Sequence, residues 1–200
     1  MNDERERSSG ADDPARRRLV PGYFVAVVLV AAMIAGIVVV IAGGGNGSPV
    51  SDDPFAPQYE GLEDRRTEAG VPTMAEGGGE HFHPLLEVYV RGEQIPVPAN
   101  IGIDPAQPPE PMAGLHTHDT TGTIHNEAGT GSTLGQFFEV WGVEFTRSRL
   151  GPYEADGEEK VRMWVDGGPS QDFGDLELAD GQQIVVSFGS NADTPSGLGS

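Results

Sequence analysis

The sequence predicts an α+β protein in which one N-terminal transmembrane helix is followed by a small β-rich domain outside the membrane. The first observation behind this prediction is YFVAVVLVAAMIAGIVVVIA, an uncharged run of twenty residues at positions 23–42. A helix of this length spans about the 30 Å of a bilayer core. The second observation is that several strand-like segments follow, with a single helix-like segment among them. That order favours α+β over a parallel α/β fold.

The flanks of the apolar run predict its orientation. Three arginines at residues 16–18 come directly before it, whereas GGGNGSPVSDDP after it contains no basic residue. Because positive flanks stay in the cytoplasm, we expect a single-pass helix over residues 19–42, in contact with the lipid bilayer through residues 23–42, and an extracytoplasmic C-terminal domain. A signal peptide cleaved at residues 40–42 is the alternative. Signal h-regions are about 7 to 15 residues long, so the length favours a retained anchor in the cell membrane.

Composition divides the rest of the chain. Residues 1–18 are charged and lack apolar periodicity, which indicates a disordered cytoplasmic tail. Residues 43–79 are rich in Gly, Pro and acidic residues, which indicates a flexible linker. Residues 80–190 remain as one globular ectodomain, long enough to bury a modest core. Residues 191–200 are predicted to be a disordered tail.

Charge and cysteine content limit the function. The net charge is −19, and residues 1–19 contain five Arg and five acidic residues, so the excess negative charge lies after the membrane segment. An acidic ectodomain repels nucleic acid and anionic headgroups, which excludes DNA and RNA as partners. Because the chain has no Cys, a metal site can use only His, carboxylate, Met or backbone ligands.

The first part of the predicted ectodomain contains a strand and a loop. HFHPLLEVYV at residues 81–90 alternates between apolar and polar positions, which predicts a strand. Pro96 and Pro98 confine the next segment to a sheet edge, because proline cannot donate to a central ladder. The proline-rich residues 104–114 predict a loop. The apolar face of the first strand carries Phe82, Leu86, Val88 and Val90.

The second part contains the one main helix and two further strands. STLGQFFEVWGV at residues 132–143 has apolar residues at helical spacing, with Ser132 or Thr133 as N-cap and Gly142 as a stop. Residues 161–168 and 182–189 predict the last two main strands, and the Asp-Gly within the first of them predicts a turn. Four aromatic residues are interpreted as core: Phe137, Phe138, Trp141 and Trp164.

Two resemblances accompany these patterns. The order of a helix, then V-x-M-W-V-D-G, then LADGQQIVVSFG resembles the second half of small β-grasp domains. It covers residues 132–189 and implies a helix packed across a mixed sheet, with a D-G turn before the last strand. The whole chain also resembles an uncharacterised, membrane-anchored prokaryotic family with an H-x-H strand, an L-H-T-H-D-x-x-G-x-I-H segment and a T-L-G-x-F-F helix. Fold likeness bears little on activity, so the resemblances supply a grouping and no mechanism.

LHTHDTTGTIH at residues 115–125 holds three of the five histidines in the chain. If DTTG is a four-residue loop, a length common in hairpins, then strands 115–118 and 123–126 pair with each other. In that register His116 faces His125 across the ladder. A three-residue loop would shift the register and remove this pairing.

The predicted hairpin sorts its side chains by chemistry. Because strand side chains alternate, His116, His118 and His125 share one face, while Leu115 and Ile124 share the other. We expect the apolar face in the core and the imidazoles outside it. Directly opposed Cβ atoms lie about 4.5 to 5.5 Å apart, which allows His116 and His125 to bind one ion, with His118 as a third ligand.

His81 and His83 repeat the pattern at the start of the first strand. An H-x-H pair on a strand shares one face, and here this is the face opposite the apolar one. If that strand lies beside the hairpin, all five histidines line one patch. His81 and His83 are then extra ligands or a second site.

Ligand chemistry restricts the ion. Three neutral imidazoles suit zinc or copper, and a nitrogen-only set disfavours Ca(II) and Mg(II). Met112, four residues before His116, offers copper a weak sulfur ligand. Asp119 and Glu127 are the expected partners that orient an imidazole through its other nitrogen.

The resulting hypothesis is a His-rich extracytoplasmic domain that binds, delivers or senses zinc or copper. Two alternatives stay open. One is a structural or protein-interaction module of the cell envelope, with an envelope protein as partner, in which the histidines are polar surface. The other is a zinc-dependent hydrolase or hydratase, with Glu87 or Glu127 as acid or base. The sequence contains no nucleophile elbow, phosphate loop or nucleotide fingerprint.

Overall fold

The computed structural model describes residues 52–75, 77, 81–107 and 112–199, and Ser48–Ser200 form one compact unit. The predicted membrane segment, residues 23–42, lies outside the described residues. Within the described part, no helix is both long enough and apolar enough to cross a bilayer.

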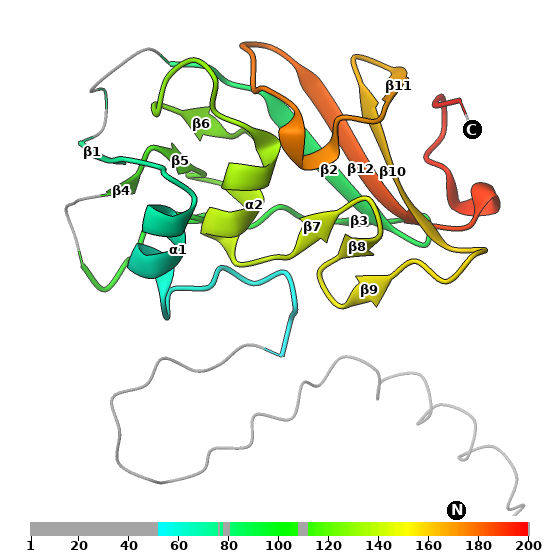
Figure 1. The fold of residues 1–200 in the computed structure, drawn as a ribbon, viewed down its shortest axis with the longest axis horizontal. Coiled ribbons are helices and arrows are strands. Elements are labelled where there is room, and N and C mark those ends of the chain that lie inside the picture. The colour runs from blue at the N-terminus through cyan, green and yellow to red at the C-terminus, as the bar shows by residue number, and fades with distance from the viewer. Residues whose placement is uncertain (1–51, 76, 78–80, 108–111, 200) are drawn as a thin grey trace, which may run out of the picture. The chain divides into compact units, whose positions relative to one another are not determined.

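The unit is an α+β fold built on one mixed five-stranded sheet (Figure 1). The inner neighbours β2 and β12 run parallel, and every other neighbour pair is antiparallel. Smaller antiparallel pairs and one three-stranded sheet surround it. Across the large sheet, the strands are β11 (Gly168–Ser170), β10 (Lys160–Val165), β12 (Gln183–Gly189), β2 (Leu85–Val90) and β3 (Glu93–Ile95).

The sequence pattern predicts β2, β10 and β12, whereas no separate strand was predicted at β11. β2 alternates as predicted, with Leu86, Val88 and Val90 buried. β3 lies at the sheet edge, as the prolines after it required. Asp166 and Gly167 form the two-residue turn between β10 and β11, with φ of 51° and 80°. Positive φ at both positions is the requirement of a type I′ hairpin.

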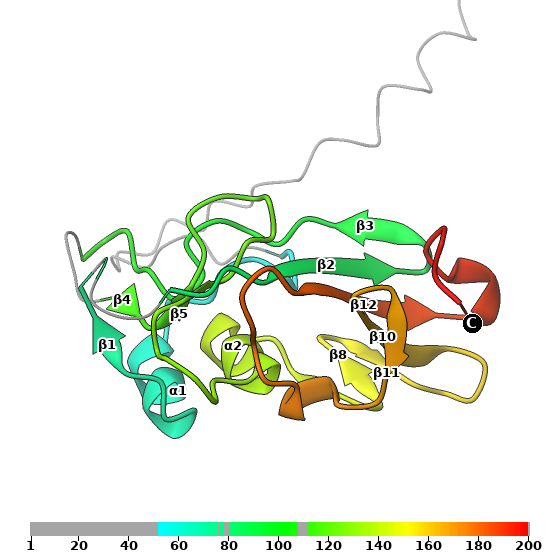
Figure 2. The same ribbon diagram turned by 90° about the horizontal axis from the view of Figure 1, so that it is seen from above.

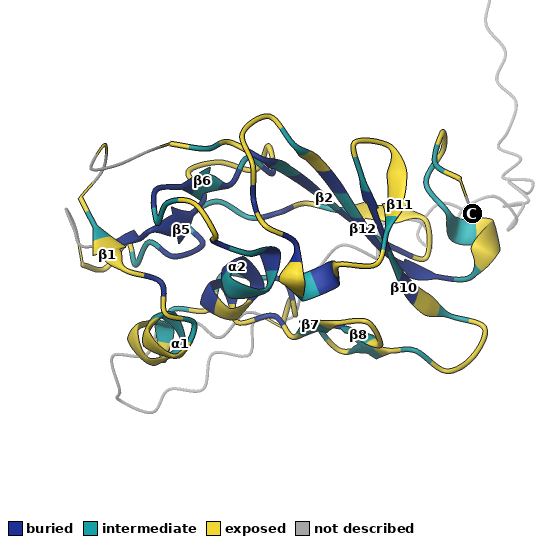
Figure 3. Cartoon of the chain, turned by 45° about the horizontal axis from the view of Figure 1, so that its top comes forward, coloured by how far each residue is buried: buried dark blue, intermediate teal, exposed yellow. Residues whose placement is uncertain are grey.

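Helix α2 (Leu134–Trp141) lies on one face of the large sheet (Figure 2). Its apolar side chains join those of the strands in a single core, which appears in dark blue along α2 and the inner strands (Figure 3). The four aromatic residues interpreted as core are all at most 2% exposed. The indole Nε1 of Trp141 donates to the carbonyl of Phe55 at 3.0 Å, so its one polar group is satisfied in the core.

Thr133 is the N-cap of α2, and it forms a capping box with Gln136. Replacing Thr133 by Ala is expected to lower the free energy of unfolding by about 1 kcal/mol, because the amide of Gln136 loses its acceptor. Urea unfolding measures this difference. Thr120→Ala, at an exposed loop position, serves as the control and should change stability by less than about 0.5 kcal/mol. Equal effects of the two substitutions would contradict the capping assignment.

Part of the predicted linker is folded, which corrects the division at residue 80. Phe55 and Val71 are 3% and 2% exposed and belong to the core. Between them, α1 (Leu62–Glu68) packs beside α2, and the side chain of Gln136 donates to the carbonyl of Ala69 at 2.8 Å. The apolar residues of this segment are too sparse to show periodicity, and composition alone therefore predicted a linker.

The predicted C-terminal tail also contacts the fold. It contains the short 3-10 helix η2 (Asn191–Asp193), and the carbonyl of Gly199 accepts a hydrogen bond from Trp164 Nε1 at 2.8 Å. Trp164 is 2% exposed. A buried indole N–H needs an acceptor, and in this fold the acceptor comes from the segment predicted to be disordered.

The remaining elements are short. β4 begins at Met112, inside the segment 104–114 that was predicted to be a loop. A second 3-10 helix, η1 (Phe173–Asp175), packs beside α2. The paired strands are β1 (Thr73–Met74) with β4 (Met112–Ala113), β5 (Leu115–His116) with β6 (His125–Asn126), and β7 (Phe145–Thr146) with β8 (Arg149–Leu150) and β9 (Tyr153–Glu154).

Candidate metal centre

The histidine hairpin has the predicted register over a shorter length than expected. His116 pairs with His125, and Leu115 pairs with Asn126. The ladder ends there because the backbone N–H of Thr117 donates to Ile101 O at 3.1 Å and that of Ile124 donates to Pro84 O at 2.9 Å. The two arms are therefore drawn apart towards different segments. The prediction was therefore wrong in length, because it extended the paired strands over 115–118 and 123–126 with a four-residue loop between them.

The loop of the hairpin packs against the start of β2. The carbonyl of Gly122 accepts the N–H of Leu86 at 2.9 Å, and Gly122 has φ of 85°. A Cβ at this position would lie 2.2 Å from the carbonyl oxygen of Leu86, so only glycine fits. This contact, with the bridge between Leu85 and Thr123, holds the hairpin beside the large sheet.

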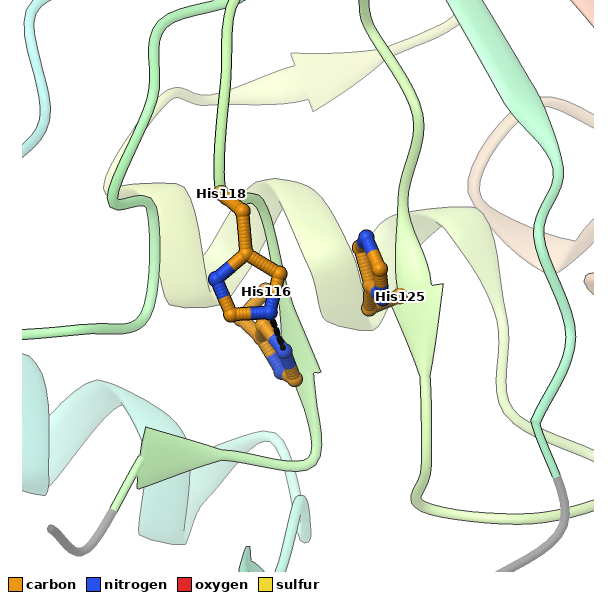
Figure 4. A group of neighbouring side chains, drawn as sticks. All are labelled: His116, His118 and His125. Carbon is orange, nitrogen blue, oxygen red and sulfur yellow. Dashed lines mark hydrogen bonds between the residues drawn. The ribbon is translucent and has the colours of Figure 1, made fainter. Parts of the chain in front are cut away.

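His116, His118 and His125 lie close together, with a hydrogen bond between His116 and His118 and with His125 across from them (Figure 4). One nitrogen from each imidazole lies within 4.8 Å of the others, and the Nε2 atoms of His116 and His118 are 3.2 Å apart. With Zn–N bonds of about 2.0 to 2.1 Å, two ligand nitrogens of a tetrahedral ion lie about 3.3 to 3.4 Å apart. The group, called the triad below, could hold a metal ion.

His116 is fully buried, contrary to the expectation that all the imidazoles lie outside the core. Its exposure is 0%, whereas His118 is exposed and His125 is half-buried. Burial is tolerated because the Nδ1–H of His116 donates to the carbonyl of Ala113 at 2.8 Å. That hydrogen bond fixes the tautomer, so the unprotonated Nε2 of His116 accepts from His118 Nε2 at 3.2 Å. The predicted apolar pair, Leu115 and Ile124, is in the core at 0% exposure.

The electrostatics favour neutral imidazoles at His116 and His125. Burial lowers the pKa of His116 to about 4, although its hydrogen bond to Ala113 opposes the shift. Burial also lowers the pKa of His125, helped by the neighbouring His118 and His83. A metal ligand must offer an unprotonated nitrogen, so His116 and His125 need lose no proton at neutral pH.

His81 and His83 lie beside the triad, in the residues that lead into β2. The rings of His83 and His125 meet edge to face with centroids 4.9 Å apart, and those of His81 and His83 are stacked at 6.0 Å. The five histidines therefore form one continuous cluster. The predicted strand at 81–90 starts only at Leu85, so the outer pair sits on the approach to the strand.

The two predicted orienting carboxylates have different roles. Glu127 Oε1 accepts from His81 Nε2 at 2.5 Å and from the N–H of Gly77 at 3.3 Å. Burial opposes ionisation, but these hydrogen bonds and the nearby imidazoles keep the pKa of Glu127 below its ordinary value. Asp119 instead accepts from the N–H and hydroxyl of Thr121 at 2.9 and 2.5 Å. Through these two hydrogen bonds Asp119 stabilises the turn of the hairpin.

Two other candidate groups have contacts of their own. Met112 pairs with Met74 in the β1–β4 ladder. Glu87, a candidate acid or base, accepts from the hydroxyl of Tyr89 at 2.9 Å and lines a cavity of about 540 Å³ beside η2.

Sequence patterns missed two partners in the cluster. The Ala113 carbonyl could not be identified because backbone acceptors leave no sequence signal. Asp180 Oδ1 accepts the backbone N–H of His83 at 2.9 Å and lies 3.6 Å from its ring Nδ1. Asp180 is 97 residues away in the sequence, so only the β2–β12 pairing brings the two together.

Comparison with known proteins adds no assignment. No family model matches the chain, no curated protein matches it, and no solved structure matches it. What the centre does must therefore be inferred from its own residues.

Proposed function

We propose that this chain is a single-pass membrane protein whose extracytoplasmic domain binds zinc or copper through His116, His118 and His125. The observation that carries the proposal is the convergence of three imidazole nitrogens within 4.8 Å, with one of them supplied by a buried ring of fixed tautomer. Burying an imidazole destabilises the fold unless each ring nitrogen forms a hydrogen bond or binds an ion. His116 Nδ1–H donates to Ala113, and His116 Nε2 shares a hydrogen bond with His118 Nε2 at 3.2 Å, which a bound ion would replace.

The choice of ion follows from the ligand set. An all-imidazole site suits zinc or copper, because both accept neutral nitrogen ligands, whereas Ca(II) and Mg(II) require oxygen. The role we propose is reversible binding for delivery or sensing. His118 is exposed, so an ion at the triad is within reach of solvent or of an envelope partner.

The proposed membrane location rests on the sequence. The apolar run at 23–42 and the arginines before it support a membrane anchor with the folded unit outside. We also propose that the folded unit is β-grasp-like. The support is a mixed sheet with parallel central strands β2 and β12, helix α2 across one face, and an Asp-Gly turn at residues 180–181 before β12.

Zinc affinity tests the proposal. Full-length protein, purified in detergent, is titrated with zinc against a chromophoric chelator, and the same titration is run with copper. We expect a Kd for zinc or copper below about 1 µM. His116→Ala with His125→Ala should weaken that affinity at least about a hundredfold, because the ion loses two of its three nitrogens.

Thr120→Ala is the matched control, since Thr120 belongs to the same hairpin and is exposed. Its affinity should equal that of the wild type. If the wild type binds neither metal below micromolar concentration, the metal proposal fails. The remaining candidate is then an envelope module whose histidines form a polar surface.

A second candidate function is hydrolysis or hydration at a zinc ion. Three protein nitrogens leave a fourth position for water, whose pKa falls to about 7 on zinc. Glu127 is the available acid or base, because its carboxylate is buried within the histidine cluster. Zinc-loaded protein that hydrates CO2 or cleaves activated esters, with loss of activity in Glu127→Gln, would favour this function. Activity equal to that of free zinc would count against it.

A further inference from the structure

One cavity of the folded unit is lined by three basic side chains. It has a volume of about 360 Å³ and lies beside β10, where Arg147, Lys160 and Arg162 line it together with Trp164 and Phe173. None of the described residues that line it is acidic. The volume falls in the range of small-molecule sites, about 300 to 1,000 Å³. This cavity, called the basic cavity below, shares no residue with the triad.

The three cavity cations lack the carboxylate partners that most other basic residues have. The chain contains twelve Lys and Arg, and five of them lie in residues 1–19, which leaves seven in the folded unit. None of the three cavity cations forms an ion pair with a described Asp or Glu. Three of the other four are ion-paired with glutamates: Arg66, Arg91 and Arg149. In a chain with a net charge of −19, an unpaired group of cations is a local site of positive potential that attracts anions.

Arg147 is positioned by an aromatic ring rather than by a carboxylate. Its guanidinium carbon lies 5.0 Å from the centroid of the Phe173 ring, a cation–π contact that leaves the charge uncompensated. Phe173 has φ of 48°, a left-handed conformation that is unfavourable for a bulky residue. Backbone strain of this kind is concentrated at ligand sites. Here it places a ring that is 5% exposed under Arg147 at the wall of the basic cavity.

Arg162 is held in place by neutral oxygen atoms. Its Nη1 donates to the carbonyl of Gly189 at 2.7 Å, and its Nη2 donates to Oδ1 of Asn191. Asp193, whose pKa Arg162 helps to lower, lines the cavity beside η2 and not the basic cavity. Arg162 therefore supplies positive charge at a fixed position.

The basic cavity also adjoins an unpaired stretch of sheet edge. β11 pairs with β10 only from Met163 to Val165. Among the described strands, none pairs with that edge of β10 over residues 160–162. Backbone N–H and C=O groups at a free edge are available to other molecules, so a ligand in the cavity has main-chain partners beside the basic side chains.

We propose that the basic cavity binds a small organic dianion such as a phosphate monoester. Among the described residues, the side chains of Arg147 and Lys160 form no hydrogen bond, so their donors are free for the anionic group. A phosphate monoester carries a charge of about −1.5 to −2 at pH 7, which balances these two cations, and arginine binds phosphate in a bidentate manner. The apolar part of the ligand packs against Phe173 and Pro169, which line the same cavity. This site is separate from the metal-binding function and does not depend on it.

Isothermal titration calorimetry with phenyl phosphate tests the proposal. Full-length protein is purified in a non-ionic detergent and freed of metal before the titration. We expect a Kd below about 1 mM, binding at least about tenfold tighter than that of inorganic phosphate, and no binding of uncharged benzyl alcohol. Phthalate, an aromatic dicarboxylate, is titrated as a second dianion. The tighter of the two dianions identifies the anionic group that the site prefers.

The variant Arg147→Gln with Lys160→Gln should bind phenyl phosphate at least about tenfold more weakly, because the anion loses two charged donors. Both side chains are exposed, so the variant should fold as the wild type does. The matched control is Arg66→Gln with Arg149→Gln, which removes the same total charge from two ion-paired residues. Its affinity should equal that of the wild type.

Three outcomes would overturn the proposal. The first is that neither dianion binds, and the second is that inorganic phosphate binds as tightly as phenyl phosphate. The third is an equal loss of affinity in the two charge variants, because binding would then follow the overall charge and not the cavity. The variant His116→Ala with His125→Ala separates this site from the triad and should bind phenyl phosphate unchanged. Loss of binding there would place the anion on a metal at the triad, which would overturn the basic cavity and favour the metal proposal.

Discussion

A chain that begins at residue 80 is expected not to fold cooperatively. It lacks Phe55 and Val71, which are 3% and 2% exposed in the core, and it lacks α1. It also leaves the indole of Trp141 without its acceptor, the carbonyl of Phe55. Removing one large buried side chain costs about 2 to 5 kcal/mol. The combined loss is comparable with the whole stability of a small domain, about 5 to 15 kcal/mol.

Circular dichroism and limited proteolysis measure this effect on a fragment of residues 80–200. The matched control is a fragment of residues 48–200, which corresponds to the compact unit and should unfold in one cooperative transition. A fragment of 80–200 that unfolds at the same temperature as the control would show that residues 52–75 contribute nothing to the core.

Acid is expected to destabilise the metal-free protein through His116. Its pKa is about 4 in the fold and about 6.5 in an unfolded chain. The unfolded state therefore takes up a proton first, and stability falls as the pH drops from about 6.5 to about 4. The difference amounts to about 3 kcal/mol. Above pH 6.5 this contribution is fully present, and it no longer varies with pH.

Urea unfolding at a series of pH values between 4 and 7.5, in the presence of a chelator, measures the loss. The control is His116→Gln, which cannot take up the proton and should lose about 3 kcal/mol less over the same range. His125, whose pKa is also lowered, adds a change of the same sign to both proteins. If the free energy of unfolding falls equally with pH in the two proteins, the conclusion that His116 is buried and neutral is contradicted.

The parts of the fold that the sequence predicted are those with a strong local pattern. The alternation of β2, the N-cap of α2 at Thr133, one of two residues proposed for it, and the Asp166-Gly167 turn were read correctly. In each case the signal lies within about ten residues and depends on side-chain period or turn chemistry. The α+β class follows from these elements alone.

The elements that the sequence missed are held by contacts between distant segments. α1 has no buried residue of its own, and it is fixed by bonds such as that from Arg65 Nε to the carbonyl of Glu139 at 3.1 Å. The segment after β12 is fixed by Trp164. Neither segment has an apolar period, so both were assigned by composition to linker and tail.

The candidate site shows the same division. The register that places His116 opposite His125 was predicted, although residues 117–124, and not a four-residue loop, connect the two strands. The burial of His116 was not predicted, because it depends on the Ala113 carbonyl. The strand length was overestimated, because Thr117 and Ile124 bond to segments whose positions no local pattern indicates.

Metal content after dialysis tests the central claim most directly. Full-length protein and the His116→Ala, His125→Ala variant are loaded with zinc or copper, dialysed against metal-free buffer and analysed by elemental mass spectrometry. The account predicts that the wild type retains about one equivalent per chain more than the variant. Equal retention in the two proteins would contradict it, and the three converging imidazoles would then be a polar surface of the fold.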